Sequence, residues 1–188
     1  MIKQLIKKFI KITKPILDLL LLLFYDRKYI VGRHFEDNVS GYIYSLRSIW
    51  LKNILRLARP SQFPTALTCY ISNSKNIHFH PDDLNNFQSP GTYFQNFNGQ
   101  IYLGKGTYIA PNVGIITANH TVGNLDSHEE GSDVIIGEKC WVGMNSVILP
   151  GVELGDNTIV AAGAVVTKSF PQGNIILAGV PAKVIKEI

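Results

Sequence analysis

The 188-residue sequence contains only two cysteines, Cys69 and Cys140. Two cysteines are too few for a disulfide framework and lack the paired spacing of a zinc knuckle, so a reducing, cytosolic setting is expected. The apolar run from Leu19 to Phe24 is far shorter than the roughly 20 residues that cross a bilayer. No small-x-small cleavage site follows this run, and we therefore expect neither export nor a membrane span.

Charge is distributed unevenly along the chain. Residues 1–60 hold 12 Lys and Arg against 4 Asp and Glu, a net charge of +8, whereas residues 61–188 hold 6 against 10, a net charge of −4. Glycine divides in the same way, because 14 of the 16 glycines lie from Gly91 onward. We therefore expect a basic helical region over residues 1–66 and a differently built domain over residues 67–188.

The start of the chain predicts an amphipathic helix. Four lysines between Lys3 and Lys14 recur at helical spacing on one face, opposite aliphatic and aromatic side chains. This pattern is typical of a helix that lies in the surface of an anionic membrane, here the inner face of the cytoplasmic membrane. The alternative is that residues 1–24 pack on the rest of the protein or on another subunit.

Residues 41–59 predict a second amphipathic helix. Its apolar side comprises Ile43, Leu46, Ile49, Trp50, Ile54 and Leu57, and Lys52 belongs to the basic side. No helix-turn-helix or RNA-binding signature accompanies the positive charge, so no nucleic-acid partner is expected.

An aliphatic residue returns every six positions in the second half of the chain. The repeated positions are Ile136, Val142, Ile148, Leu154, Val160 and Val166, with Leu103, Ile109 and Ile115 upstream in the same frame. A period of six fits neither a helix nor a simple strand, and it requires a chain that turns a corner after each short strand. Three such sides make an 18-residue coil with the aliphatic residues inside and small residues at the corners.

The frame predicts how many coils there are and what closes their ends. We expect two coils over Ile136–Pro171, one over Leu103–His120, and one or two irregular coils over residues 67–102, with Phe79 and Phe97 in frame. The exposed ends of a stack of coils need covers, and the apolar N-terminal segment and the tail PAKVIKEI are the candidates.

Four segments resemble a known family: YIAPNVGIITANH, VIIGEKCWVGMNSVILPGV, TIVAAGAVVTKSFP and AGVPAKVI. Over roughly Asn96 to Ile185 the chain resembles the hexapeptide-repeat acyltransferases of the maltose, galactoside and nodulation O-acetyltransferase type, including polysaccharide O-acetyltransferases. The resemblance implies a left-handed parallel β-helix with a helical N-terminal extension. It also implies a homotrimer with sites between subunits, acetyl-CoA as donor, and a sugar hydroxyl of bacterial surface polysaccharide (capsule, exopolysaccharide or lipopolysaccharide) as acceptor.

By its place in PNVGIITANH, His120 resembles the family's catalytic histidine, which acts as general base. It lies in the long break of the repeat that follows Ile115, where we expect a loop. The base must be held in one tautomer, so its other ring nitrogen needs an acceptor. The candidates are a backbone carbonyl or the side chains of Asn98, Asp126 and Glu130.

The resemblance assigns further residues to acceptor, oxyanion and donor. Asn98, with Asn96 as its alternative, falls near the acceptor contact, and a role as an ordinary turn asparagine is the competing interpretation. The amide of Met144, after Gly143, corresponds to the oxyanion donor. The residues expected to contact coenzyme A are Ala161, Ala162 and Gly163 along the pantetheine arm and Lys168 and Lys183 at the phosphates.

Three other functions compete with O-acetyl transfer. An N-acetyltransferase of an amino sugar nucleotide would use the same donor groove. A zinc hydratase of the γ-carbonic anhydrase kind would need three imidazoles, whereas His120 and His128 offer two, and we expect no metal. A non-catalytic prism would not bind coenzyme A. His80, with Asp82 or Asp83, is a further candidate for acceptor contact.

Overall fold

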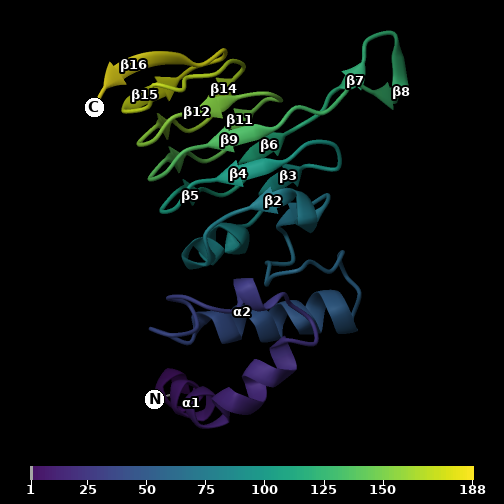
Figure 1. Cartoon of the computed structure of the whole chain (residues 1–188), viewed down its shortest axis with the longest axis vertical. Coiled ribbons are helices and arrows are strands. Elements are labelled where there is room, and N and C mark those ends of the chain that lie inside the picture. Colours follow the sequence, from purple (N-terminus) through teal and green to yellow (C-terminus); the bar gives the residue numbers. More distant parts are fainter. Residues whose placement is uncertain (1) are drawn as a thin grey trace.

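The computed structural model describes residues 2–188, with the side chains of residues 2–4, 6, 7 and 11 outside the description. Figure 1 shows helices gathered at the N-terminal end of the molecule, followed by stacked coils of short strands that continue to the C-terminus. The helical elements of the N-terminal end are α1 (Ile2–Leu21), η1 (Arg27–Tyr29), α2 (Ser40–Ser48) and η2 (Ile49–Ile54). None of the described helices combines the length and the apolarity of a membrane span.

The second helix is shorter than its sequence predicts. It changes from α-helix to the π-helix η2 at Ile49 and ends at Ile54, so the prediction of a helix as far as Arg59 is wrong. Arg56 adopts a left-handed φ of 55°, which a right-handed helix does not accommodate. Within η2, Lys52 points inward rather than to the basic surface: it is 3% exposed and donates a hydrogen bond to Thr65 Oγ1 at 2.7 Å.

Three parallel sheets form the sides of the coils. Face A contains β1 (Tyr70–Ile71), β3 (Tyr93–Gln95), β6 (Gly114–Ile116), β11 (Val147–Ile148) and β14 (Val165–Val166). Face B contains β2 (Ile77–His78), β4 (Ile101–Leu103), β9 (Val134–Ile136) and β12 (Glu153–Leu154). Face C contains β5 (Tyr108–Ile109), β10 (Trp141–Val142), β13 (Ile159–Val160), β15 (Ile175–Ala178) and the antiparallel β16 (Lys183–Glu187). Strands β9 to β14 pass through faces B, C and A in turn, which makes a three-sided coil.

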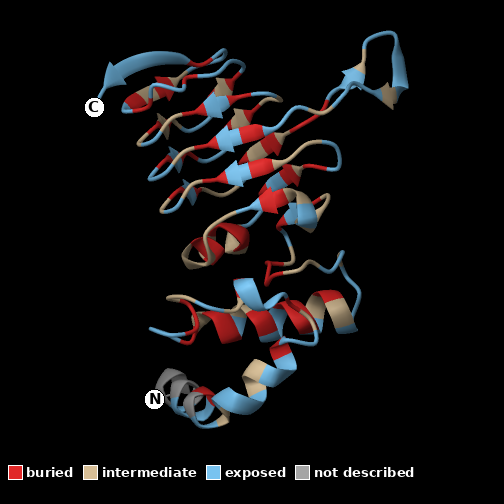
Figure 2. Ribbon diagram, viewed as in Figure 1, coloured by how far each residue is buried: buried red, intermediate tan, exposed pale blue. Residues whose placement is uncertain are grey.

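The register of the strands confirms the predicted length of the coil. Trp141 pairs with Ile159 and Val147 pairs with Val165, so the two partners of each pair are one predicted coil apart in the sequence. All nine aliphatic residues of the six-residue frame are buried, and none is more than 5% exposed. Figure 2 shows this alternation along the coils, where buried segments are followed by exposed or intermediate ones.

Small residues at the corners let neighbouring coils approach closely. A Cβ placed on Gly143 would lie 2.7 Å from both the amide nitrogen of Ala162 and the carbonyl oxygen of Val160 in the next coil. Any side chain at that position would therefore force two coils apart. The corner at Asn145 takes a left-handed φ of 60°, a conformation that asparagine tolerates better than most residues.

The first coils are irregular, as their sequence predicts. Ile77 pairs with Ile101, so this coil is longer than a regular one, and the 3₁₀ helix η4 (Pro81–Gln88) accommodates the additional length. Another 3₁₀ helix, η3 (Ser74–Asn76), directly precedes β2. Phe79 is partly buried and stacks on Tyr29 at 4.8 Å between ring centroids. Phe97 does not occupy the interior, and its predicted place in the frame is wrong: it is 43% exposed and packs against His128.

A hairpin interrupts the regular coils. Tyr108 pairs with Trp141, so the coil between them is nearly twice as long as a regular one. The inserted segment includes β7 (His120–Thr121) and β8 (Asn124–His128), which pair antiparallel. Figure 1 shows this hairpin projecting away from the stack at the edge between faces A and B.

Both ends of the stack are covered, and the tail covers the C-terminal end as predicted. The tail forms β16, which pairs with the open edge of β15. At the other end the buried rings of Phe63 and Phe87 pack together at 4.7 Å between centroids. One continuous apolar cluster thereby joins the helices to the coils, so the division into two domains at residues 66 and 67 stays a prediction.

Two adjacent isoleucines of β9 allow a test of which positions of the six-residue repeat point into the prism. Ile136 is 1% exposed and Ile135 is 41% exposed. We expect Ile136→Ala to lower the free energy of unfolding by about 2–5 kcal/mol, because it leaves a cavity inside the prism. Ile135→Ala, the matched control on the outer surface, should cost less than about 1 kcal/mol. Urea unfolding measures both, and equal effects would contradict the frame.

Candidate functional site

His120 lies on the projecting hairpin, where its orientation is fixed by the chain's own backbone. It is exposed, begins β7 and pairs with His128 across the hairpin, with 4.3 Å between ring centroids. Its Nδ1 lies 2.7 Å from the carbonyl oxygen of Leu125. A carbonyl can only accept, so Nδ1 carries a proton, and in the neutral imidazole Nε2 then has the lone pair. This arrangement makes Nε2 a proton acceptor that faces away from the hairpin's own hydrogen bond.

The acceptor that holds His120 is thus a backbone carbonyl and none of the three predicted side chains. Asp126 follows Leu125 in β8, and its amide donates to Asn124 Oδ1 at 3.2 Å. The side chain of Asn98 reaches instead toward the carbonyl of Glu129. No sequence signal singles out Leu125, because a carbonyl belongs to every residue and its direction depends on the turn of the hairpin.

The base of the hairpin is held by two polar residues that sequence reasoning missed. The Gln95 Oε1 accepts hydrogen bonds from the amides of Thr117 and Ala118, at 3.1 Å each, and its Nε2 donates to the Ala118 carbonyl at 3.0 Å. The fully buried Thr117 donates from Oγ1 to the carbonyl oxygen of Asn98 at 2.6 Å. These bonds attach the start of the insertion to the preceding coil, so they position His120.

Of the two predicted acceptor residues, the structure brings Asn98 to the hairpin. The Asn98 Nδ2 is 3.4 Å from the carbonyl oxygen of Glu129, and a Cβ on Gly131 would overlap the Asn98 carbonyl. Asn96 is fully buried, and its side-chain amide accepts from the Asn73 amide at 2.9 Å and donates to the Asn73 carbonyl at 2.8 Å. Asn96 therefore links two coils, whereas Asn98 lies beside the base that carries His120.

The predicted oxyanion and coenzyme residues line a different edge, between faces C and A. The amide of Gly143 donates to the carbonyl of Val160 at 2.8 Å, and the amide of Gly163 donates to the carbonyl of Met144 at 2.9 Å. No group in the described part of the chain accepts a hydrogen bond from the Met144 amide. This edge therefore offers a free backbone donor beside the small corner residues Ala161, Ala162 and Gly163.

The two predicted phosphate contacts lie on different edges. Lys183 begins β16 and pairs with Ala178, so it lies near the edge that carries Met144. Lys168 follows β14 at the edge between faces A and B, with its Nζ 5.5 Å from the centroid of the Phe170 ring. Both side chains are exposed. The edge that carries Met144 is thus separated by face A from the edge that carries the hairpin of the same chain.

Neither cysteine is a candidate nucleophile. Both side chains are buried, and burial raises the pKa of Cys69 to about 11 and also raises the pKa of Cys140. The thiolate is the reactive form, so these thiols are inert near neutral pH. Within the described residues, no group of three or more His, Cys, Asp or Glu side chains is arranged to hold a metal ion.

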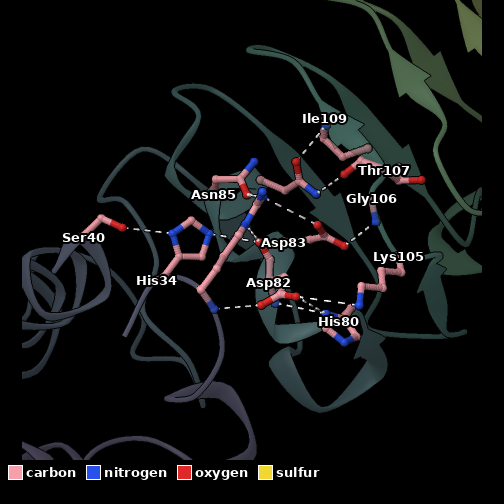
Figure 3. A network of polar contacts seen from close by, with 12 residues as sticks. His34, Ser40, His80, Asp82, Asp83, Asn85, Lys105, Gly106, Thr107 and Ile109 are labelled. Carbon is pink, nitrogen blue, oxygen red and sulfur yellow. Dashed lines mark hydrogen bonds and ion pairs between the residues drawn. The ribbon is translucent and has the colours of Figure 1, made fainter. Parts of the chain in front are cut away.

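His80, Asp82 and Asp83 belong to a polar network between the helical end and the coils (Figure 3). The Asp82 Oδ1 accepts from the Arg33 amide at 2.8 Å, and the Asp83 Oδ2 accepts from the Gly106 amide at 2.8 Å. The His80 Nδ1 is 3.5 Å from the Asp82 Oδ2. Asp82 thus contacts the segment before α2, and Asp83 contacts the turn before β5 on face C. Neither carboxylate contacts the hairpin.

The two aspartates of this network respond to pH in opposite directions. The hydrogen bond from the Arg33 amide lowers the pKa of Asp82, so its ionised form stabilises the folded state. Burial raises the pKa of Asp83, which is 4% exposed, so its ionised form costs stability at neutral pH. The Asp82 contribution is complete above the ordinary aspartate pKa of about 3.9 and is lost as the pH falls through the lowered value.

Comparison with known proteins gives one family and several relatives. Residues 133–168 match the family described as bacterial transferase hexapeptide (six repeats). The chain is 31% identical over 186 residues to the putative lipopolysaccharide biosynthesis O-acetyl transferase WbbJ of Escherichia coli K12, covering 79% of this chain and 89% of that protein. It is 36% identical over 123 residues to the galactoside O-acetyltransferase of the same organism, covering 63% of this chain and 58% of that protein.

A crystal structure of a maltose O-acetyltransferase from Clostridium difficile 630 is similar with a TM-score of 0.49 and 33% identity, covering 63% of this chain and 62% of that one. The putative acetyltransferase YJL218W of Saccharomyces cerevisiae is 36% identical over 119 residues, 58% of this chain. This chain spans 60% of that protein and 47% of a putative acetyltransferase of Dictyostelium discoideum. The chain thus spans about half of several curated relatives that it matches.

The Asp82 contact predicts a pH-dependent loss of stability. We expect Asp82→Asn to lower the free energy of unfolding by about 1 kcal/mol or more at pH 7, because a charged acceptor is replaced by a neutral one. At pH 3 the difference should shrink, since the wild-type carboxylate approaches its own protonation. Thermal unfolding at both pH values measures this, with the exposed Asp37→Asn as control for net charge. A difference that stays constant between pH 7 and pH 3 would disprove the assignment.

Proposed function

Because the chain belongs to the hexapeptide-repeat acetyltransferases, we propose that it transfers an acetyl group from acetyl-CoA to a sugar hydroxyl of a bacterial surface polysaccharide. The observation that carries the proposal is the imidazole of His120, which projects on an inserted hairpin with Nδ1 bonded to the Leu125 carbonyl and Nε2 available. The lipopolysaccharide relative, aligned over most of both chains, supports a saccharide acceptor. The coil winds left-handed in this proposal, as the resemblance implies.

The reaction follows from the one free nitrogen of His120. Nε2 removes the proton from the sugar hydroxyl, and the oxygen attacks the carbonyl carbon of the acetyl thioester. The negative charge that develops on the carbonyl oxygen accepts a hydrogen bond from the free Met144 amide. Collapse of the tetrahedral intermediate breaks the carbon–sulfur bond, and the imidazolium returns its proton to the leaving thiolate. No covalent bond to the enzyme forms.

The edge that carries Met144 fits the coenzyme A arm. Its corner residues Ala161, Ala162 and Gly163 have little or no side chain, so an extended pantetheine can lie against the backbone. The exposed ammonium group of Lys183, near this edge, would meet its phosphates, for which a point charge is sufficient, whereas Lys168 lies on the other edge of the same chain. Asn98, at the base of the hairpin, would contact the acceptor sugar.

The separation of the two edges favours a site shared between subunits. His120 is on the edge between faces A and B, and Met144 is on the edge between faces C and A. The hairpin projects away from its own stack. We therefore place His120 of one subunit against the Met144 edge of the next, in a homotrimer with three equivalent sites.

Replacement of the base should abolish transfer without unfolding the protein. We expect His120→Ala to reduce kcat/KM by about 10²- to 10⁴-fold, because no other group takes the proton from the hydroxyl. The dissociation constant of coenzyme A and the oligomer mass should not change. The assay is mass spectrometry of candidate saccharides after incubation with acetyl-CoA.

His78→Ala is the matched control, since His78 is an exposed histidine of β2 on face B, where its side chain is hydrogen-bonded to Gln100. Its turnover should equal that of the wild type. Wild-type rates in His120→Ala would remove the proposed base. Product that resists mild alkali would show transfer to an amine, as expected of an amino sugar N-acetyltransferase, and would contradict the hydroxyl acceptor.

Mixed oligomers test whether the site is shared. Met144→Pro removes the proposed oxyanion donor, and His120→Ala removes the base, so each variant alone should be inactive. Co-assembled at equal amounts, they should recover about a quarter of the wild-type activity, because random neighbours restore one complete site in four. Sites built within one chain would stay inactive in the mixture, and that result would refute the shared arrangement.

A further inference from the structure

Helix α1 presents a continuous apolar stripe to solvent. The stripe comprises Leu5, Phe9, Ile12, Ile16, Leu19 and Leu23, which are between 60% and 76% exposed. Their spacing alternates between four and three residues, so they lie on one side of the helix and continue into the turn after it. Contiguous exposed apolar side chains of this kind mark a surface that binds something.

The stripe does not pack on the protein because another side of α1 does. Ile10 and Leu21 are buried against the body at 4% and 0% exposure. On that side Lys14 forms an ion pair with Asp18 at 3.0 Å, and the Tyr42 hydroxyl of α2 donates to Asp18 at 2.6 Å. In Figure 2, α1 lies at the end of the molecule farthest from the C-terminal coils, with much of its outer side exposed.

The net charge of residues 1–25 indicates which kind of partner the stripe binds. Residues 1–25 contain five lysines and one acidic residue, Asp18, a net charge of +4. Asp18 is engaged by Lys14 and Tyr42, so it does not offset the remaining lysines. Lys8 is exposed directly before Phe9, beside the stripe. An apolar stripe on a segment of net positive charge is complementary to a surface that is apolar inside and anionic outside.

We propose that the α1 stripe binds the surface of an anionic lipid bilayer, with the helix lying in the plane of the headgroups. The six side chains of the stripe enter the acyl boundary, and Lys8 beside the stripe contacts lipid phosphates. A second copy of α1 fits the stripe less well, because two segments of +4 repel each other. The positions flanking the stripe also supply no acidic residue to pair with Lys8. This inference is independent of acetyl transfer.

Sedimentation of the full-length protein with vesicles tests the surface. We expect binding to vesicles of phosphatidylcholine with phosphatidylglycerol, and much weaker binding to phosphatidylcholine alone. The double variant Phe9→Gln, Ile16→Gln should lower the partition coefficient at least tenfold, because two apolar side chains no longer enter the bilayer while glutamine keeps the helix. Lys8→Gln should lower it roughly fivefold, and high salt should weaken binding of the wild type.

Matched variants at the other end of the molecule serve as controls. Val184→Gln with Ile185→Gln removes two exposed apolar side chains of β16, and Lys186→Gln removes an exposed charge there. All three substitutions should leave vesicle binding unchanged. The proposal is overturned if the Phe9 and Ile16 variant binds as the wild type does. It is equally overturned if that variant instead dissociates an oligomer in light scattering. Transfer to a soluble saccharide should be unaffected, so failure here leaves the proposed activity standing.

Discussion

The close stacking of coils in a fixed register is the constraint on which the rest of this structure depends. Parallel ladders hold adjacent coils about 4.8 Å apart, and at the corner of Gly143 a single added Cβ would lie 2.7 Å from the next coil. Each side of the prism contributes a short strand that buries at least one aliphatic side chain inside. The interior is therefore filled by side chains, and the corners admit small residues or those that tolerate a left-handed backbone.

Ligands and the residues that act on them have to lie on the outside of such a prism, because its interior is filled with side chains. In the proposed mechanism, two features of the chain meet this requirement. One is the insertion that carries His120, which Gln95 and Thr117 attach to the coil beneath it. The other is the edge at Met144, where the corner leaves a backbone amide free. Rigid coils fix both positions, so in the proposed shared site the distance between His120 and the Met144 amide would be set by how the subunits meet.

The helical end is joined to the coils by aromatic packing and by two buried or partly buried carboxylates. Asp82 and Asp83 accept backbone hydrogen bonds from Arg33 and Gly106, so they connect segments that lie far apart in the sequence. They are structural here and remote from the hairpin, although aspartates near a histidine resemble a binding cluster in the sequence. The same helical end leaves the outer stripe of α1 without a protein partner in the described chain.

The six-residue recurrence of aliphatic residues was sufficient to predict the coils, their register and the break that holds His120, because a repeated side-chain period has few structural solutions. It did not predict the outward position of Phe97, the early end of the helix at Ile54 or the burial of Lys52, because each depends on packing between distant segments. The sequence also did not predict which group accepts the hydrogen bond from His120 Nδ1. The Leu125 carbonyl is chemically identical to every other carbonyl, and the folded hairpin alone brings it within 2.7 Å of the ring.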